Sequence, residues 1–357
     1  MLKISFAVAA FIGLVSAGPH CDKNAPCFRK SSKPIKPVLK STLEDVEIPT
    51  NWIWNNVDGV NYLTNIKNQH IPQYCGSCWA QASTSALSDR IKIQRKAQWP
   101  DINIAPQVVI SCSSNDLGCN GGEALSAYDF MHNNEFTDET CSIYRARGNT
   151  NGAECSPIIK CKDCVPHQPC FVPDQYHIYK VGEFGALQGE QAMLQEVYQR
   201  GPIACAIAVP DDLETYRGGI YEDTTGDTEL VHEISVVGFG EENGKKYWVA
   251  RNSWGSAWGE SGFFRVVRGT NNIGIESDCA FAVPEDTWTN EVKHITTQEE
   301  KQDPRNLKET TNGPYPESEA SGFLMNEHHT GCTIKRNPLL TQVADGPMSW
   351  DLVSASD

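Results

Sequence analysis

The sequence predicts an α+β fold in which a helical half precedes a strand-rich half. In residues 78–94, apolar side chains recur near every 3.6 positions, which indicates a helix. Residues 230–239 and 245–252 read as two strands, and the intervening residues 241–244 have the polar and glycine character of a turn. An early helix followed by a late hairpin therefore predicts the α+β class.

Composition and charge narrow the class of protein. The chain has 357 residues, of which 39% are hydrophobic and 21% charged, as expected of a globular protein. Its formal net charge of −15 argues against nucleic acid or an anionic membrane surface as the main partner. Fourteen cysteines are too many for a routine cytosolic protein and favour an oxidising compartment.

The N-terminus has the features of a secretory signal. Lys3 precedes an apolar run over residues 4–15, and the small residues Ser16, Ala17 and Gly18 follow. The run is too short to span a bilayer. We therefore expect residues 1–17 to be a cleaved signal peptide and the mature protein to be soluble, in a lysosome or vacuole or outside the cell.

Three further segments differ in composition. Residues 18–47 are polar and basic and lack the apolar periodicity needed for a core. Residues 48–284 are dense in tryptophan, glycine and cysteine, which indicates one compact domain. Residues 285–357 are rich in acidic residues with scattered prolines, so we expect a C-terminal extension that is either flexible or loosely docked on the domain.

Cys78 stands at the start of the expected helix, where the positive end of the helix dipole favours a thiolate. A thiolate can attack a carbonyl carbon if a proton carrier and an oxyanion site are present. The alternative is that Cys75 and Cys78 are both structural, in a disulfide or a zinc site. The residues around the two cysteines leave both interpretations open.

The hairpin adds the missing proton carrier. His232 and Asn252 lie almost symmetrically about the expected turn, so antiparallel pairing would bring them together. An imidazole oriented by a carboxamide and facing a thiol is an arrangement for nucleophilic catalysis. Glu233 follows His232, and because neighbours in a strand point to opposite faces, we expect its carboxylate to point away from the ring.

These residues belong to motifs that together resemble the papain family of cysteine peptidases over residues 48–284. The matching motifs are Cys75-Gly76-Ser77-Cys78-Trp79, Cys119-Asn120-Gly121-Gly122, His232 ahead of residues 236–240, and Asn252-Ser253-Trp254-Gly255. The resemblance implies two lobes, a helical N-terminal lobe and a β-barrel-like C-terminal lobe, with the active-site cleft between them. It implies that Cys78 is the nucleophile, His232 the base and acid, and Asn252 the residue that orients His232.

The family places its oxyanion glutamine six residues before the nucleophile, but Pro72 stands there in this chain. Gln69 fits instead if the three residues His70-Ile71-Pro72 are an insertion. Such an insertion resembles the mini-loop of the cathepsin X group (also called cathepsin Z), whose histidine receives the carboxylate of a peptide C-terminus. A protonated histidine suits that task through a charge-assisted hydrogen bond. The alternative is that His70 is an ordinary residue of a surface loop.

The resemblance therefore implies a carboxypeptidase in which the substrate-binding residues are His70, Tyr74, Gly121, Gly122 and Trp254. The alternatives are a papain-like endopeptidase and a catalytically silent binding protein with the same fold. Expected partners are peptide or protein substrates and protein inhibitors of cysteine peptidases. We expect a monomer, with no nucleic acid, membrane, cofactor or metal.

The remaining cysteines need an assignment. The spacing Cys161-x-x-Cys164-x-x-His167-x-x-Cys170 would suit zinc, but the signal peptide favours disulfides. The resemblance implies the bridges Cys75–Cys119, Cys112–Cys155, Cys141–Cys161, Cys164–Cys170 and Cys205–Cys279. Cys21, Cys27 and Cys332 are left over.

We expect Cys27 to keep the enzyme precursor inactive. The resemblance implies a zymogen in which residues 18–47 are a short propeptide and Cys27 forms a disulfide with Cys78. A disulfide can hold a segment that has few apolar contacts. The alternative is that Cys27 pairs with Cys21, which lies within reach.

Overall fold

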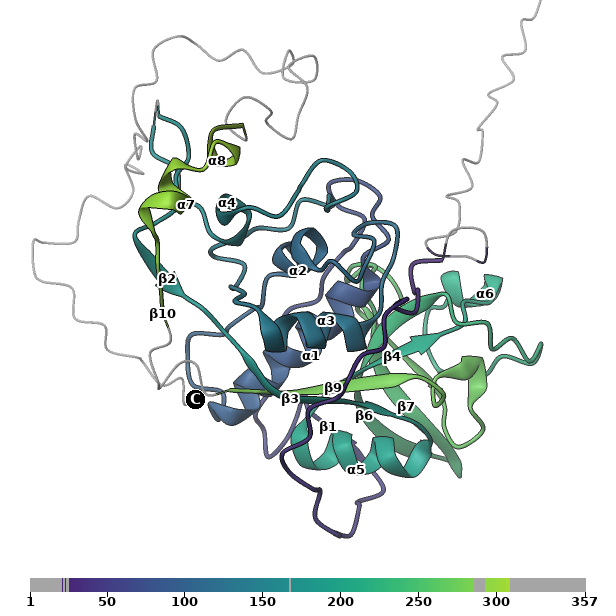
Figure 1. Cartoon of the computed structure of the whole chain (residues 1–357). Coiled ribbons are helices and arrows are strands. Elements are labelled where there is room, and N and C mark those ends of the chain that lie inside the picture. Colours follow the sequence, from purple (N-terminus) through teal and green to yellow (C-terminus); the bar gives the residue numbers. More distant parts are fainter. Residues whose placement is uncertain (1–20, 22, 24–25, 167, 286–292, 309–357) are drawn as a thin grey trace, which may run out of the picture. The chain divides into compact units, whose positions relative to one another are not determined.

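The structure is a computed structural model that describes residues 21, 23, 26–166, 168–285 and 293–308 (Figure 1). The expected signal peptide, His167, Cys332 and the end of the C-terminal extension lie outside these residues. Within them, no helix is long and apolar enough to cross a membrane.

The larger helices gather mainly in the first half of the chain and the longer strands in the second half, as expected of an α+β fold. The helices are α1 (Cys78–Gln94), α2 (Pro106–Cys112), α3 (Ala124–Asn133), α4 (Pro157–Lys160), α5 (Glu190–Arg200), α6 (Asp211–Glu214), α7 (Gln298–Gln302) and α8 (Arg305–Lys308), with a 3₁₀ turn at Asn272–Gly274. The strands are β1 (Trp52–Ile53), β2 (Gln175–His177), β3 (Val181–Leu187), β4 (Ile203–Ile207), β5 (Ile220–Tyr221), β6 (His232–Glu242), β7 (Lys245–Arg251), β8 (Phe263–Val267), β9 (Cys279–Pro284) and β10 (Lys293–Ile295).

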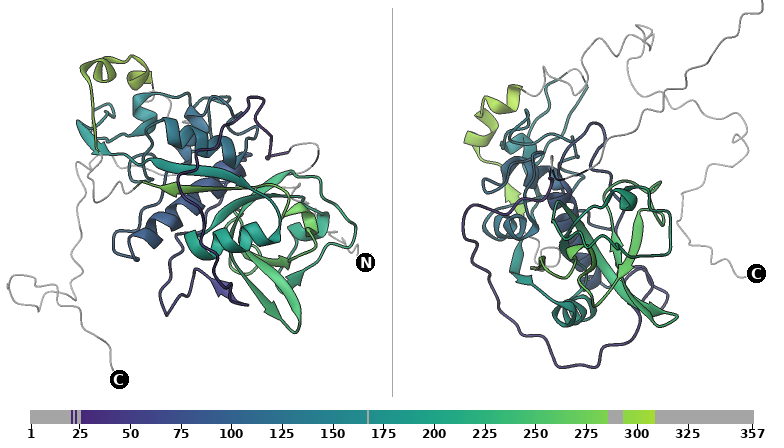
Figure 2. Two further views of the ribbon diagram at one scale, coloured as in Figure 1. Left: turned by 60° about the horizontal axis from the view of Figure 1, so that its bottom comes forward. Right: turned by 90° about the vertical axis from the view of Figure 1, so that its right-hand side faces the viewer.

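Helix α1 is the centre of the helical lobe and has the bounds that the apolar periodicity predicts. Its first fourteen residues, Cys78 to Ile91, are all buried, because α2 and α3 pack on one side and the sheet on the other. Trp79 and Leu87 anchor this core with fully buried side chains. Figure 2 shows α1–α3 gathered on one side of the molecule and the strands β6–β8 on the other.

The second lobe is a twisted sheet with its own core. The strand order is β3-β9-β4-β6-β7-β8-β5, and β1 adds to β6 outside this path. Among the described strands the order does not close, since β3 and β5 remain at opposite edges. The expectation of a β-barrel-like lobe is corrected: the sheet is open. The edge strand β5 is only two residues long and pairs with β8 alone.

The β6–β7 hairpin differs slightly from its predicted bounds. Strand β6 continues to Glu242, and the turn is only Asn243 and Gly244, with φ of 52° and 78°. Positive φ at both positions is the geometry of a two-residue turn that matches the twist of the strands. The strands therefore extend closer to the turn than the sequence pattern indicates.

Residues 293–308 of the C-terminal extension form regular elements that pair with the domain. Strand β10 pairs antiparallel with β2, and Thr297 and Glu300 form a capping box at α7. His294 lies between two carboxylates, with Nδ1 at 2.8 Å from Glu135 and Nε2 at 3.1 Å from Glu300. The composition alone did not indicate these contacts, because they depend on partners far along the chain.

Candidate active site

The two lobes bring Cys78 and His232 into one buried site. Cys78 is the first residue of α1 and His232 the first residue of β6, and neither side chain is exposed. The Nε2–H of His232 donates to Oδ1 of Asn252 at 2.8 Å. The Trp254 ring stacks on the imidazole with 4.8 Å between the ring centroids and 30° between the ring planes. The Asn252 carboxamide thus fixes the orientation of the imidazole ring through Nε2, and Nδ1 is the ring nitrogen that does not contact Asn252.

Gln69 occupies a rigid position beside these residues. Its side chain is fully buried, its Nε2 donates to the Cys75 carbonyl at 3.1 Å, and its Oε1 accepts from Ser253 Oγ at 2.7 Å. The same Nε2 lies 3.7 Å from the sulfur of Cys21. A fixed N–H at this place is able to stabilise an oxyanion.

The inserted loop lies directly after Gln69. His70 stacks on Tyr74 with 4.8 Å between ring centroids and 8° between planes, and its backbone N–H donates to Oδ1 of Asn68 at 3.0 Å. Ile71 and Tyr74 are exposed, so the loop projects from the domain at the edge of the site. His70 directly follows Gln69 in the chain, and both of its ring nitrogens are buried in this structure.

Gly121 and Gly122 form a backbone surface that we call the glycine wall, and neither position accepts a side chain without strain. A Cβ at Gly122 would lie 2.7 Å from the Trp79 ring, and Gly121 has φ of +108°. The backbone of Gly122 pairs with the N-terminal segment: its carbonyl accepts from Arg29 N at 2.8 Å and its N–H donates to Cys27 O at 3.2 Å. An extended peptide is thus bound at this wall.

The disulfides separate structural cysteines from the reactive candidate. The structure forms all five bridges that the family resemblance implies, including Cys75–Cys119, and leaves Cys78 as a free thiol. Cys161, Cys164 and Cys170 are in disulfides, so the zinc alternative for that segment does not hold. Cys75 is structural and Cys78 is not.

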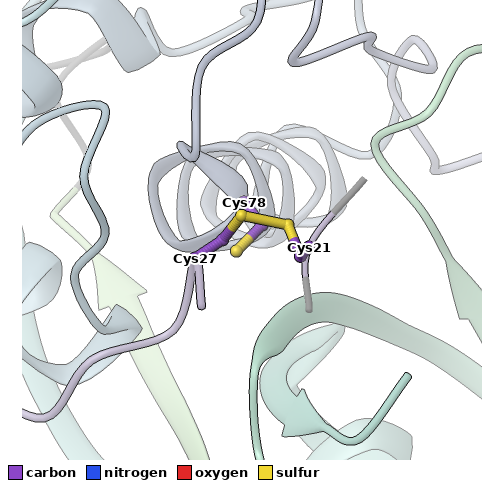
Figure 3. Close-up of side chains that lie close together, drawn as sticks. All are labelled: Cys21, Cys27 and Cys78. Atoms are coloured by element: carbon purple, nitrogen blue, oxygen red, sulfur yellow. A yellow bond between two sulfur atoms is a disulfide. The ribbon is translucent and has the colours of Figure 1, made fainter. Parts of the chain in front are cut away.

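The structure contradicts the expected latch between Cys27 and Cys78. Cys27 instead bonds Cys21, with 5.7 Å between their Cα atoms, which is an ordinary separation for a disulfide (Figure 3). The three sulfurs lie within 4.8 Å of one another, so the disulfide rests against the Cys78 thiol without bonding it. The sulfurs of Cys21 and Cys27 are bonded to each other and offer no thiolate to a metal in this state.

The electrostatics keep Cys78 protonated in this state. Burial raises the pKa of the thiol well above its usual value, and the nearby Glu233 raises it further, while backbone N–H groups act in the opposite direction. The helix dipole alone does not produce the thiolate here, since the N-terminal segment excludes water. The Oε1 of Glu233 accepts a hydrogen bond from Ala124 N at 3.0 Å.

Two groups of residues were missed from the sequence. Arg251 forms a buried ion pair with Asp89 at 2.5 Å and thereby joins β7 to α1 behind the site. Glu123 and Asp278 both pair with Lys30 of the N-terminal segment. The only sequence signal for the second group is the basic character of residues 18–47, which does not identify the acidic partners.

Comparison with known proteins agrees with this geometry. The profile of the family described as "Papain family cysteine protease" matches residues 48–283. The chain belongs to this family and is a cysteine protease. It is 45% identical to "Cathepsin Z" of Onchocerca volvulus over 247 residues, which cover 67% of this chain and 78% of that protein. It is also 30% identical to "Cathepsin B-like cysteine proteinase 1" of Haemonchus contortus, over 67% of this chain and 74% of that protein.

Solved structures support the same fold. Digestive procathepsin L 3 of Tenebrio molitor larval midgut superposes with a TM-score of 0.56 at 28% identity, covering 71% of this chain and 75% of that chain. The structure titled "proCathepsin B S9 from Trypanosoma congolense" gives 0.56 at 26% identity, covering 70% and 82%. Both titles name precursor forms. The disulfides and this family membership are consistent with the secretory pathway.

Proposed function

We propose that the protein is a carboxypeptidase that removes residues from the C-terminus of peptides and is made as a zymogen. The observation that carries the proposal is the inserted loop, in which His70 directly follows Gln69 in the chain and its ring stacks on Tyr74. The relative in Onchocerca volvulus that bears the name "Cathepsin Z" supports the same reading.

The chemistry is acyl transfer. With water admitted, the Cys78 thiol gives its proton to His232 and attacks the scissile carbonyl carbon. Gln69 Nε2 and the backbone N–H of Cys78 stabilise the oxyanion. The imidazolium then gives its proton to the leaving amine, and water hydrolyses the thioester with His232 as base. Asn252 keeps the ring in the required orientation throughout.

His70 supplies the selectivity for a chain end. A protonated imidazole donates a charge-assisted hydrogen bond to a carboxylate, which an amidated C-terminus does not offer. Tyr74 supports the ring by stacking against it, with 4.8 Å between the two centroids. A substrate bound along Gly122 would then extend from the wall to this loop, with its scissile bond at Cys78.

Latency follows from the position of the N-terminal segment, which we propose is the propeptide and call the prosegment. Its Cys27 and Phe28 N–H groups donate to the Val231 carbonyl at 2.9 Å, and its Cys21–Cys27 disulfide lies at Gln69 Nε2. The disulfide therefore occupies the place where a substrate carbonyl must bind. We propose entry into the secretory pathway through residues 1–17, with a lysosomal or extracellular destination.

The test is His70→Ala in the matured enzyme, with Ile71→Ala in the same loop as the matched control. We expect His70→Ala to lower kcat/KM for free-acid peptides by about tenfold or more, as for the loss of a charge-assisted hydrogen bond. Amidated peptides should change little, and the Ile71→Ala variant should keep the wild-type ratio. Equal losses on both kinds of peptide would contradict the role of His70 and favour an endopeptidase.

A further inference from the structure

A chain of hydroxyl groups joins the two segments that supply the oxyanion donors. The phenol oxygen of Tyr144 lies 2.7 Å from Ser77 Oγ, and its O–H donates to the main-chain carbonyl of Gln69 at 2.6 Å. A carbonyl oxygen only accepts hydrogen bonds, so the Tyr144 proton is committed to Gln69 and the Ser77 hydroxyl must donate to Tyr144. Burial raises the pKa of the phenol to about 12, although the hydrogen bond with Ser77 acts in the opposite direction. The phenol therefore remains a donor at neutral and acidic pH.

Ser77 takes part in this chain in place of a common role of serine. It is the N-cap residue of α1 and is fully buried, yet its side chain makes no capping hydrogen bond to the helix. A serine at an N-cap usually accepts from a backbone N–H of the first turn. Here the hydroxyl bonds Tyr144 instead and anchors the peptide unit between Ser77 and Cys78. The N–H of that unit belongs to the first turn of α1 and has no carbonyl partner within the helix, so it can donate to an oxyanion.

Gln69 is held by both lobes, and Tyr144 provides the contact from the helical lobe. Ser253 binds Gln69 twice: Gln69 N donates to Ser253 O at 2.9 Å, and Gln69 Oε1 accepts from Ser253 Oγ at 2.7 Å. Tyr144 binds the carbonyl of Gln69, and the N–H of the same peptide unit, from His70, donates to Oδ1 of Asn68. Tyr144 therefore fixes the peptide plane at which Gln69 ends and the inserted loop begins.

The inserted loop explains why a tie between the two segments is needed. Cys78 lies nine positions after Gln69, and the three residues 70–72 lengthen the connection between the two oxyanion donors. A longer connection has more conformations, so the chain itself determines the separation of its ends less closely. Tyr144 contacts the connection at Gln69 and at Ser77, next to its two ends. The tie comes from residues outside the loop and is independent of the loop's own conformation.

We propose that Tyr144 is a positioning residue that sets the separation of the two oxyanion donors, Gln69 Nε2 and the backbone N–H of Cys78. It acts through the main chain of Gln69 and through Ser77. Donors that are already in place stabilise the transition state without a cost of reorganisation. The inference rests on the oxyanion assignment within the proposed acyl transfer, and it applies to a carboxypeptidase and to an endopeptidase alike.

The test is Tyr144→Phe in the matured enzyme, with Tyr179→Phe as the matched control. Tyr179 is buried in the core of the helical lobe, and its phenol donates to Asp138 Oδ2 at 2.8 Å. On one free-acid peptide, Tyr144→Phe should lower kcat by about tenfold and leave KM within about twofold. Removal of an oxyanion donor itself costs more, about 100- to 1,000-fold. Tyr179→Phe should keep the wild-type kcat, and an equal loss in both variants would overturn the proposal.

Two reagents that react with Cys78 separate oxyanion stabilisation from the reactivity of the thiol. With a peptide aldehyde, the sulfur bonds to the carbonyl carbon and the C=O electron pair moves to oxygen, which takes up the thiol proton. With iodoacetamide, the sulfur is alkylated, iodide leaves and no oxyanion forms. Tyr144→Phe should weaken aldehyde binding by about tenfold and leave the alkylation rate within about twofold of wild type. An unchanged aldehyde affinity, or an equal loss with both reagents, would contradict the positioning role.

Ser77→Ala tests whether the hydroxyl groups act as one chain. It should also lower kcat, and the loss in the Ser77→Ala, Tyr144→Phe double variant should be smaller than the product of the two single losses, because both changes interrupt the same chain. Losses that multiply would contradict a shared action. A wild-type enzyme that cuts peptides only at internal bonds would contradict the proposed carboxypeptidase, but it would leave the comparison of aldehyde and iodoacetamide unaffected. The two proposals therefore fail separately.

Discussion

Asn252 provides a quantitative test of how the catalytic histidine is held. The side chain is 4% exposed, and its Oδ1 accepts from His232 Nε2 at 2.8 Å and from Ser253 N at 2.7 Å. Because His232 is cationic when it protonates the leaving group, the lost bond is one to a charged donor, worth about 1.5–3 kcal/mol. Asn252→Ala should therefore lower kcat by about 10- to 150-fold.

The assay is the pH dependence of kcat and KM on one peptide, with Asn252→Asp as the matched variant. Aspartate keeps an acceptor for His232 and should restore much of the rate lost in the alanine variant. Its negative charge stabilises the imidazolium, so the alkaline limb of the profile should move to higher pH. A kcat for Asn252→Ala within twofold of wild type would refute the idea that this hydrogen bond organises the site.

Three other predictions concern the nucleophile and the stability of the fold. Cys78→Ser should abolish turnover with an unchanged melting temperature; measurable wild-type-like rates would reject the nucleophile assignment. Burial raises the pKa of Asp116 from 3.8 to about 6, so its stabilising effect is complete below the lower value and lost as pH rises through the higher one. Urea unfolding of Asp116→Asn and wild type should show this difference changing between those pH values, and a constant difference would contradict it. Arg251→Met leaves Asp89 buried without this ion-pair partner and should cost about 3–5 kcal/mol in urea unfolding. Lys245→Met, in the exposed pair with Glu222, should cost about 1 kcal/mol or less. Equal costs in the two variants would contradict that account.

The parts of the fold that follow from local pattern could be predicted from the sequence. Helix α1 has an apolar period over its whole length, and its bounds are as predicted. The sequence predicts the hairpin turn at residues 241–244, and the structure narrows it to Asn243 and Gly244, because the pattern does not report their positive φ. Cys78, His232 and Asn252 were identified because they lie in compact motifs whose order along the chain is itself informative.

Features that depend on tertiary pairing could not be predicted. Cys27 had two partners within reach, and the choice of Cys21 depends on how the prosegment enters the cleft. The docking of residues 293–308 depends on β2 and Glu135, which are far away in the sequence. The ion pairs of Lys30 likewise join three segments that no local pattern connects.

The most direct test of the central proposal is a time course of the products that the matured enzyme releases from one peptide. The peptide is prepared once with a free C-terminus and once with an amidated C-terminus, and the products are identified by mass spectrometry. The free-acid peptide should shorten by single residues from its C-terminus, the amide should be cut far more slowly, and Cys78→Ser should give no product from either. Internal cleavage of both peptides at equal rates would contradict a carboxypeptidase and indicate an endopeptidase whose His70 loop leaves the cleft open.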